Sequence, residues 1–283
     1  MGRRMSGRFV AGMQVSDVLT ATRAMNDLGM SVSIDNLGEN VTNADEARHS
    51  AALYHELLEK ISEQKLDANV SLKLTHMGLD VDEPLSYSIV TDLVAHAARL
   101  GNFVRVDMEG SPYTQRTLDF VHQLHAEPKN KGAVGAVIQS YLFRSEKDVQ
   151  DLLAEKIRIR LCKGAYKEPP EIAFQKKSDV DANYVTLMKL LLKSGVYHGI
   201  ATHDEKMIAA TKDFARAEGI SSKAFEFQML HGIRRDLQQE LVRDGWRMRV
   251  YIPFGSEWYP YFMRRLAERP ANVFFIARNI FRS

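Results

Sequence analysis

The sequence predicts an α/β protein built as a single-domain (βα)8 barrel. Short apolar segments rich in β-branched residues alternate with longer amphipathic segments along the chain. Eight such pairs follow one another roughly 30 residues apart, which is the spacing of βαβ units. The chain has 283 residues, and α/β barrels of about 250 residues are common. Length, alternation and spacing therefore agree on one barrel.

Each apolar segment is expected to be a strand, and each segment between two strands a helix. Asn43, followed by Glu46, and Asp204 have the residue types and positions of helix N-caps, and Gly195 those of a helix stop. A doubly wound open sheet is the alternative fold, but no GxGxxG motif follows the first strand and no P-loop occurs. The expected strands are residues 30–37, 68–75, 102–109, 135–141, 156–164, 198–204, 224–230 and 248–254.

Composition and charge exclude several classes of protein. Hydrophobic residues make up 45% and charged residues 26%, which is typical of a globular domain, and the net charge of +2 offers no basic excess for nucleic acid. A single cysteine excludes an intramolecular disulfide framework. No apolar run reaches the length of a transmembrane helix or a signal peptide. We expect residues 1–283 to form one domain, with a short N-terminal lead-in and a C-terminal helix, in the cytoplasm or at most peripheral on the inner face of a membrane.

Polar side chains collect at the ends of the expected strands. Active sites of this fold lie at the C-terminal ends of the strands. Taken singly, each residue fits a loop or a cap, but together they predict a substrate or cofactor pocket. No HxH or HExxH pair occurs, so no metal site is expected. The polar residues are Asp35, Asn36, Glu39, Lys73, Thr75, Asp107, Glu109, Gln139, Arg160, Lys163, Thr202, His203, Asp204, Glu226, Gln228 and Tyr251.

A second group of polar residues follows the last expected strand. Tyr261, Arg264, Arg265 and Glu268 recur at helical spacing, in a segment that should begin the last barrel helix. Adjacent arginines can hold a carboxylate through paired hydrogen bonds. The alternative is a solvated basic patch in which Arg264 pairs with Glu268. Spacing alone does not separate these two interpretations.

At these residues the sequence resembles the proline dehydrogenase family. The matching segments run in order over nearly the whole chain, and the longest of them are specific enough to exclude chance. The family has a flavin-bearing (βα)8 barrel, in agreement with the strand count. The matching segments are SIDNLGE, VSLKL, RVDMEG, VIQSY, RLCKGAY, ATH, FEFQMLHG, RVYIPFG and YFMRRLAE.

The resemblance implies oxidation of L-proline to Δ1-pyrroline-5-carboxylate, with hydride transfer to a non-covalent FAD. It implies that Asp107 lies beside Lys73 near the flavin, and that Glu39 pairs with Arg160 over the substrate. Asp107 and Arg160 are accordingly the expected catalytic residues. The substrate-binding residues implied are Lys73, Tyr251, Tyr261, Arg264, Arg265, Leu230 and Glu39. The FAD contacts implied are Met108, Gln139, Arg160, Lys163, Gly164, Ala165, Thr202 and His203.

The resemblance also implies partners. Electrons are expected to pass to a quinone in a membrane. Because no segment resembles the aldehyde dehydrogenase or DNA-binding domains of larger relatives, a separate pyrroline-5-carboxylate dehydrogenase is expected to take the product. Two alternatives remain at this stage: a Schiff-base aldolase with Lys73 or Lys163 as nucleophile, and a regulatory barrel that binds proline without turnover.

Overall fold

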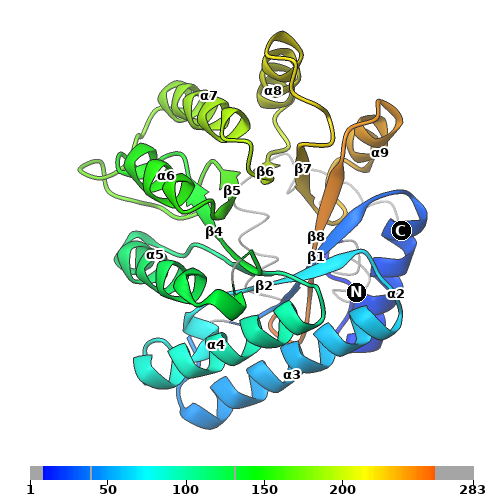
Figure 1. Cartoon of the computed structure of the whole chain (residues 1–283), viewed down its shortest axis with the longest axis vertical. Helices are drawn as coiled ribbons and strands as arrows, with labels where there is room; N and C mark the ends of the chain where they lie inside the picture. Colours follow the sequence, from blue (N-terminus) through cyan, green and yellow to red (C-terminus); the bar gives the residue numbers. More distant parts are fainter. Residues whose placement is uncertain (1–8, 39, 131, 259–283) are drawn as a thin grey trace, which may run out of the picture.

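Eight parallel strands close into a barrel in this computed structural model (Figure 1). β1 pairs with β2 on one side and with β8 on the other, as Val32 lies opposite both Ala68 and Val250. The sheet therefore has no free edge. This confirms the predicted (βα)8 fold. The strands are β1 (Ser31–Asn36), β2 (Ala68–Leu72), β3 (Val104–Val106), β4 (Val134–Gln139), β5 (Arg158–Cys162), β6 (His198–Ala201), β7 (Phe225–Leu230) and β8 (Met248–Phe254).

Helices form a ring around the barrel (Figure 1). The structure describes residues 9–38, 40–130 and 132–258. Within these residues each strand from β1 to β7 is followed by at least one α-helix. The helices are α2 (Val15–Asp27), α3 (Ala44–Glu63), α4 (Glu83–Arg99), α5 (Ser111–Ala126), α6 (Ser145–Ala154), α7 (Lys177–Lys193), α8 (Glu205–Ala217) and α9 (Arg235–Arg243), with 3-10 turns η1 (Thr75–Met77) and η2 (Pro128–Asn130).

The predicted helix signals act where the sequence places them. The Asn43 side chain accepts a hydrogen bond from the Glu46 backbone N–H (3.0 Å), and Asp204 accepts one from the Lys206 N–H (3.0 Å). These bonds satisfy backbone donors that the first turn of a helix leaves without a partner. Helix α7 ends two residues before Gly195, whose φ of 71° lies in the left-handed region. Both caps and the stop are confirmed.

Seven of the eight strands are shorter than the segments predicted for them, and β8 matches its segment. β3 pairs over only three residues of the expected segment 102–109, and β2 ends at Leu72 rather than at Thr75. The omitted residues include Lys73 and Asp107, whose polar side chains lie beyond the ladder and line the mouth of the barrel. The apolar pattern extends past the hydrogen-bonded sheet because the neighbouring residues Leu74 and Met108 are also buried.

The lumen of this barrel is polar at mid-height. Val32 and Ile34 of β1 belong to the apolar layer between strands and helices, whereas Ser33 alternates with them and points inward. The hydroxyls of Ser33 and Ser71 lie 3.0 Å apart, and both accept hydrogen bonds from Arg160. Bulky aliphatic side chains dominate the lumen of most such barrels. Here the lumen instead supports buried charges below the mouth.

Helix α2 occupies the outer position between β8 and β1. It precedes the first strand, yet it contacts both β1 and β8 (Figure 1). Trp258, at the end of the described chain, packs against Val10 and Leu37. The segment from Trp258 to Glu268, which the sequence predicts to begin the last barrel helix, lies outside the described residues apart from Trp258.

Candidate active site

A cavity of about 440 Å³ opens at the C-terminal ends of the strands. Its walls combine charged groups with apolar side chains such as Val137 and Met229. Every described residue to which the resemblance gives a role lines this one cavity, although these residues come from strands far apart in the sequence. They are Lys73, Asp107, Met108, Gln139, Arg160, Lys163, Gly164, Ala165, Thr202, His203, Leu230 and Tyr251. Four of the wider set of polar strand-end residues (Asn36, Thr75, Glu109 and Glu226) do not line it.

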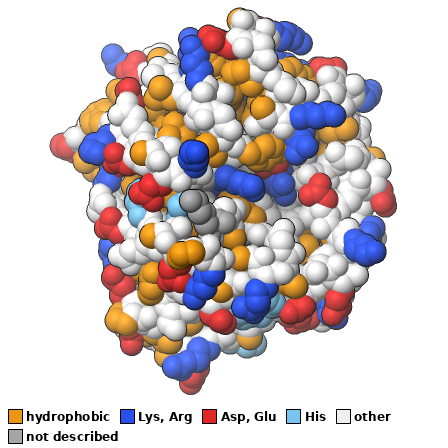
Figure 2. Space-filling model, in the orientation of Figure 1, with side chains coloured by type: hydrophobic (Ala, Val, Ile, Leu, Met, Phe, Trp, Pro, Cys, Tyr) orange, Lys and Arg blue, Asp and Glu red, His pale blue; other side chains and the backbone are white. Residues whose placement is uncertain are grey.

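Acidic and basic side chains are interspersed over the face of the molecule seen in Figure 2. The charges of the cavity, in contrast, are arranged in two ordered groups. One group surrounds Arg160 in the floor, and the other surrounds Lys163 at the side wall. The two groups suit different parts of a ligand.

Arg160 is the centre of the cavity floor. Its Nη1 donates to Asp107 Oδ1 (2.6 Å) and its Nε donates to Gln228 Oε1 (2.6 Å), while Nη2 donates to the hydroxyls of Ser33 (3.0 Å) and Ser71 (3.1 Å). Four of the five guanidinium N–H groups therefore have acceptors among the described residues. A buried charge is stable only with such partners, which hold the guanidinium in place, and its fifth N–H has no acceptor among the residues that the structure describes.

Tyr251 connects to the same ion pair. Its hydroxyl donates to Asp107 Oδ2 (2.9 Å), and the Arg160 guanidinium lies 5.1 Å from the centre of its ring. Burial, and then the charge of Asp107, raise the pKa of the Tyr251 hydroxyl well above its usual range. The phenol therefore stays protonated and keeps donating to Asp107. Both carboxylate oxygens of Asp107 are thus occupied.

Lys73 forms its ion pair with Asp35, at 3.5 Å between Nζ and Oδ2. The resemblance implies a position for Lys73 beside Asp107, and the register agrees with it, because Leu72 and Val106, the residues just before them, lie opposite each other. The carboxylate of Asp107 itself pairs with Arg160. The sequence predicts Asp35 as one of the polar strand ends of the pocket but assigns it no role of its own. Burial raises the pKa of its carboxyl group, and the neighbouring Lys73 opposes that rise. The signal that could have indicated its role is a carboxylate two residues after lumen-facing Ser33, and therefore on the same face of the strand.

Lys163 lies at the side wall in a cluster of two lysines and two aspartates. It pairs with Asp181 and with Asp204 (2.7 Å), and Lys177 contacts the same two carboxylates. Burial alone would raise the pKa of Asp204, but hydrogen bonds from Lys163 and Lys177 lower it to about 2. Lys177 begins α7 and Asp204 caps α8. Two lysines and two helix N-termini therefore meet at this end of the cavity.

Gln139, Gly164 and Ala165 shape the wall between these two groups. The Ala165 N–H donates to Gln139 Oε1 (3.3 Å), and Gln139 Nε2 donates to the Glu109 carbonyl (3.0 Å). Gly164 has φ 127°, and a Cβ atom there would lie 2.6 Å from the Tyr141 ring. The resemblance implies that this glycine contacts FAD. The structure adds a different requirement, because the glycine also makes room for Tyr141.

Thr202, His203 and Leu230 form the wall near β6 and β7. The Thr202 hydroxyl accepts from the Asp204 N–H (3.0 Å), which fixes the start of the loop. The Leu230 N–H donates to His203 Nε2 (3.0 Å). Nε2 is therefore the unprotonated nitrogen of a neutral His203. Met108, which is buried, completes the apolar surface of the cavity.

Four predicted site residues lie outside the described residues. The proposed pairing of Glu39 with Arg160, and the carboxylate-binding roles of Arg264 and Arg265, stay predictions. The role of Tyr261, in the same segment as the two arginines, also stays a prediction. These residues are Glu39, Tyr261, Arg264 and Arg265.

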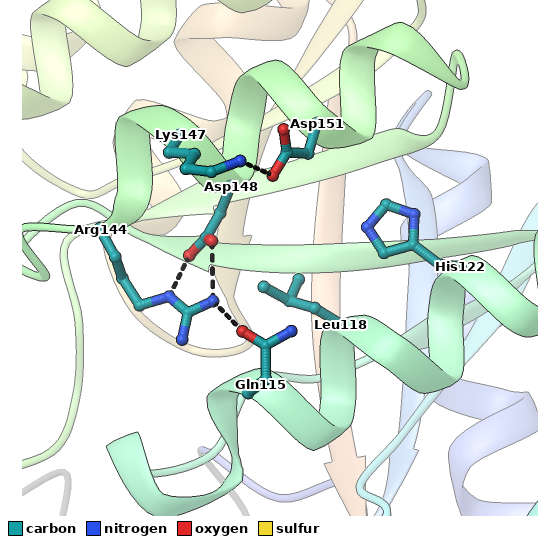
Figure 3. A pocket seen from close by; sticks show the side chains of 7 residues that line it. All are labelled: Gln115, Leu118, His122, Arg144, Lys147, Asp148 and Asp151. Atoms are coloured by element: carbon teal, nitrogen blue, oxygen red, sulfur yellow. Dashed lines mark hydrogen bonds and ion pairs between the residues drawn. The ribbon is translucent and has the colours of Figure 1, made fainter.

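A second cavity lies between α5 and α6, and its charged side chains pair with one another (Figure 3). Arg144 pairs with Asp148 (2.8 Å) and donates to Gln115 (2.6 Å), and Lys147 pairs with Asp151 (2.6 Å). These side chains satisfy one another at the surface. Surface pairs of this kind contribute little energy and offer no convergent set of groups to a ligand. The mouth of the barrel is therefore the stronger candidate site.

Comparisons with known proteins identify the family of this chain. The family model for proline dehydrogenase matches residues 18–278. The chain is 42% identical over 273 residues to proline dehydrogenase 2 of Bacillus subtilis, covering 96% of this chain and 89% of that protein. This chain belongs to the proline dehydrogenase family. It is also 40% identical over 281 residues to proline dehydrogenase of Deinococcus radiodurans, covering 98% of this chain and 90% of that protein.

Solved structures place the same family on the same fold. The chain superposes on proline utilization A of Bdellovibrio bacteriovorus, inactivated by N-propargylglycine, with a TM-score of 0.87 and 26% identity. The match covers 93% of this chain but 32% of that protein, so the chain spans about a third of the larger relative. Membership of the proline dehydrogenase family makes this chain an oxidoreductase. The aldolase and the regulatory barrel are not favoured.

Proposed function

We propose that this chain oxidises L-proline to Δ1-pyrroline-5-carboxylate, with FAD bound in the cavity at the mouth of the barrel. The observation that carries the proposal is the convergence of the family's motif residues on one cavity. Its floor presents the cations Arg160 and Lys73, and its walls are apolar, as an amino acid with one carboxylate and an aliphatic ring requires. An aldolase would need a lysine without a strong ion pair, whereas Lys163 is bound to two carboxylates.

The cavity residues fit a flavin dinucleotide. Lys177 begins α7, and Lys163 pairs with Asp204, the N-cap of α8, so two cations lie beside two helix N-termini, which suits the phosphates of a dinucleotide. The exposed backbone of Gly164 and Ala165 suits the middle of the cofactor, and Met108 and Arg160 suit its ring. FAD, when bound, supplies the acceptor for the hydride that leaves proline.

The side chains of the floor would then orient the substrate and balance its charge. Lys73, Arg264 and Arg265 would bind the proline carboxylate, and Tyr251 and Leu230 would border the ring. Arg160 would place a fixed cation next to the electron-accepting ring, where negative charge develops. Asp35 and Asp107 offset the cations before substrate arrives, so the site avoids uncompensated buried charge.

The partners proposed for this reaction follow from its chemistry. A quinone would accept the electrons, and a separate pyrroline-5-carboxylate dehydrogenase would use the product. In the described part of the chain, no helix has the length and apolarity needed to cross a membrane. We therefore propose that the chain reaches a membrane quinone from the cytoplasmic side as a peripheral protein.

The absorbance spectrum of the purified protein tests this function. We expect a flavin spectrum that loses its long-wavelength band when L-proline is added without oxygen. Lys73→Met should keep the flavin but require much more proline for the same bleaching, because it removes a carboxylate partner. A protein that binds no flavin after incubation with FAD, or a flavin that proline does not reduce, would contradict the proposal.

A further inference from the structure

Gln228 links the cavity floor to a carboxylate deeper in the barrel. Arg160 Nε donates to Gln228 Oε1 (2.6 Å), and Gln228 Nε2 donates to Glu226 Oε1 (2.7 Å). Gln228 is buried, with only 4% of its surface exposed. The amide oxygen of Gln228 therefore accepts from the Arg160 guanidinium, and its NH2 group donates to the Glu226 carboxylate. This is the only orientation of the amide that satisfies both neighbours.

Glu226 keeps its charge because two other groups support it. Arg249 Nε donates to Glu226 Oε1 (2.7 Å), and the Tyr197 hydroxyl donates to Oε2 (2.9 Å). Burial alone would raise the pKa of Glu226, but the charge of Arg249 and these hydrogen bonds lower it. A carboxylate held in this way requires a donor from Gln228 and so prevents its amide from rotating.

The neighbouring strand provides the space for this amide. Gly199 on β6 lies opposite Glu226 on β7, and a Cβ atom at position 199 would collide with Gln228 Nε2. The position opposite the amide therefore has no side chain. A close-packed chain of hydrogen bonds therefore runs from the cavity floor into the barrel interior. Its direction is fixed, because Arg160 donates to Gln228 and Gln228 donates to Glu226.

We propose that Gln228 is a positioning residue that fixes the plane of the Arg160 guanidinium beneath the bound flavin, with Glu226 setting the orientation of its amide. The proposal rests on the FAD site proposed above. A cation held in one place stabilises negative charge on the reduced ring more than a mobile one does. Gln228 would therefore raise the affinity of the cavity for reduced flavin relative to oxidised flavin.

The Gln228→Glu variant gives this proposal a distinctive readout, the midpoint potential of the bound flavin as a function of pH. While the introduced carboxyl group is protonated, it repeats both hydrogen bonds, because its O–H donates to Glu226 and its carbonyl accepts from Arg160. Once that group ionises, it loses the donor and cancels charge on Arg160. At acidic pH the potential should equal that of the wild type. As pH rises, binding of reduced flavin should weaken about tenfold relative to oxidised flavin, a fall of about 30 mV for two electrons.

Two further variants separate positioning from simple destabilisation. Gln228→Leu removes both bonds and should lower the potential at every pH. Gln238→Leu is the matched control, since Gln238 is also buried and donates two hydrogen bonds, to the Leu230 and Ile233 carbonyls, outside the lumen. It should lower the melting temperature and leave the potential unchanged.

The outcomes distinguish this proposal from the proposed function. A wild-type protein that binds no FAD contradicts the function itself. If the wild type binds FAD and the potential of Gln228→Glu follows the wild type at all pH values, the positioning role is wrong. Should Gln228→Glu fail to fold, Gln228→Leu decides, and a wild-type potential in that variant overturns the proposal.

Discussion

Asp107 and Arg160 form a buried ion pair across the barrel lumen, with 2.6 Å between Oδ1 and Nη1. Asp107 lies at the end of β3 and Arg160 lies in β5, 53 positions apart in the sequence. Tyr251 occupies the other oxygen of Asp107, so one carboxylate joins three strands at the cavity floor. This arrangement holds charge in place at the site proposed for flavin and substrate.

The Asp107→Asn variant tests how strongly the fold depends on this pair. The substitution leaves Arg160 buried without its counter-charge, so we expect a loss of about 3 kcal/mol in the free energy of unfolding. Denaturant unfolding measures this loss. Asp45→Asn is the control, because its pair with Arg48 is exposed and should contribute nothing measurable. Equal stability of the two variants would show that the pair is not structural.

Tyr251→Ser tests whether Tyr251 selects the substrate. A hydroxyl on the proline ring would collide with the Tyr251 phenol or be buried without a hydrogen-bond partner. A buried polar group without a partner costs about 1–3 kcal/mol. The variant should lose kcat/KM for proline while it holds or gains activity on trans-4-hydroxy-L-proline. Tyr251→Phe, which keeps the ring and loses the bond to Asp107, should retain the preference for proline. Equal losses on both substrates, together with a lower melting temperature, would make Tyr251 a structural residue.

Arg264→Met and Arg265→Met test the proposed carboxylate grip. Each should raise KM for proline strongly and leave FAD bound, because a charged hydrogen bond contributes about 2–3 kcal/mol. Steady-state kinetics and the ratio of flavin to protein measure the two effects separately. Arg216→Met is a control on an exposed surface of α8. Unchanged KM in both arginine variants would remove these residues from the substrate site.

Gly164→Ala tests the close approach of this residue to Tyr141. The added methyl group meets both the Tyr141 ring and an unfavourable φ, so the variant should be destabilised by more than about 1 kcal/mol and should bind less flavin. Gly101→Ala is the matched control, because its φ is also positive (65°) but no atom lies near the added carbon. If the two variants lose the same stability, strain alone explains the effect and the ring contact is unimportant.

The sequence predicted the barrel and the residues of its mouth because both depend on local patterns. Alternation located all eight strands, and the barrel geometry brings their ends together. It did not predict which charges pair. Strand phase shows that Asp35, Asp107 and Arg160 face inward, but partner choice depends on the stagger between strands and on side-chain reach. Gln228 was noted only as a polar residue at a strand end, since its role appears only with Glu226 and Arg160 beside it.

The proposed reaction requires that L-proline reduces a flavin held in the cavity above Arg160. An anaerobic titration of the FAD-loaded protein with L-proline, followed by absorbance, tests it most directly. We expect complete bleaching of the flavin at saturating proline, and formation of Δ1-pyrroline-5-carboxylate in an amount equal to the flavin reduced. A flavin that stays oxidised at saturating proline, in protein that holds one FAD per chain, would contradict it.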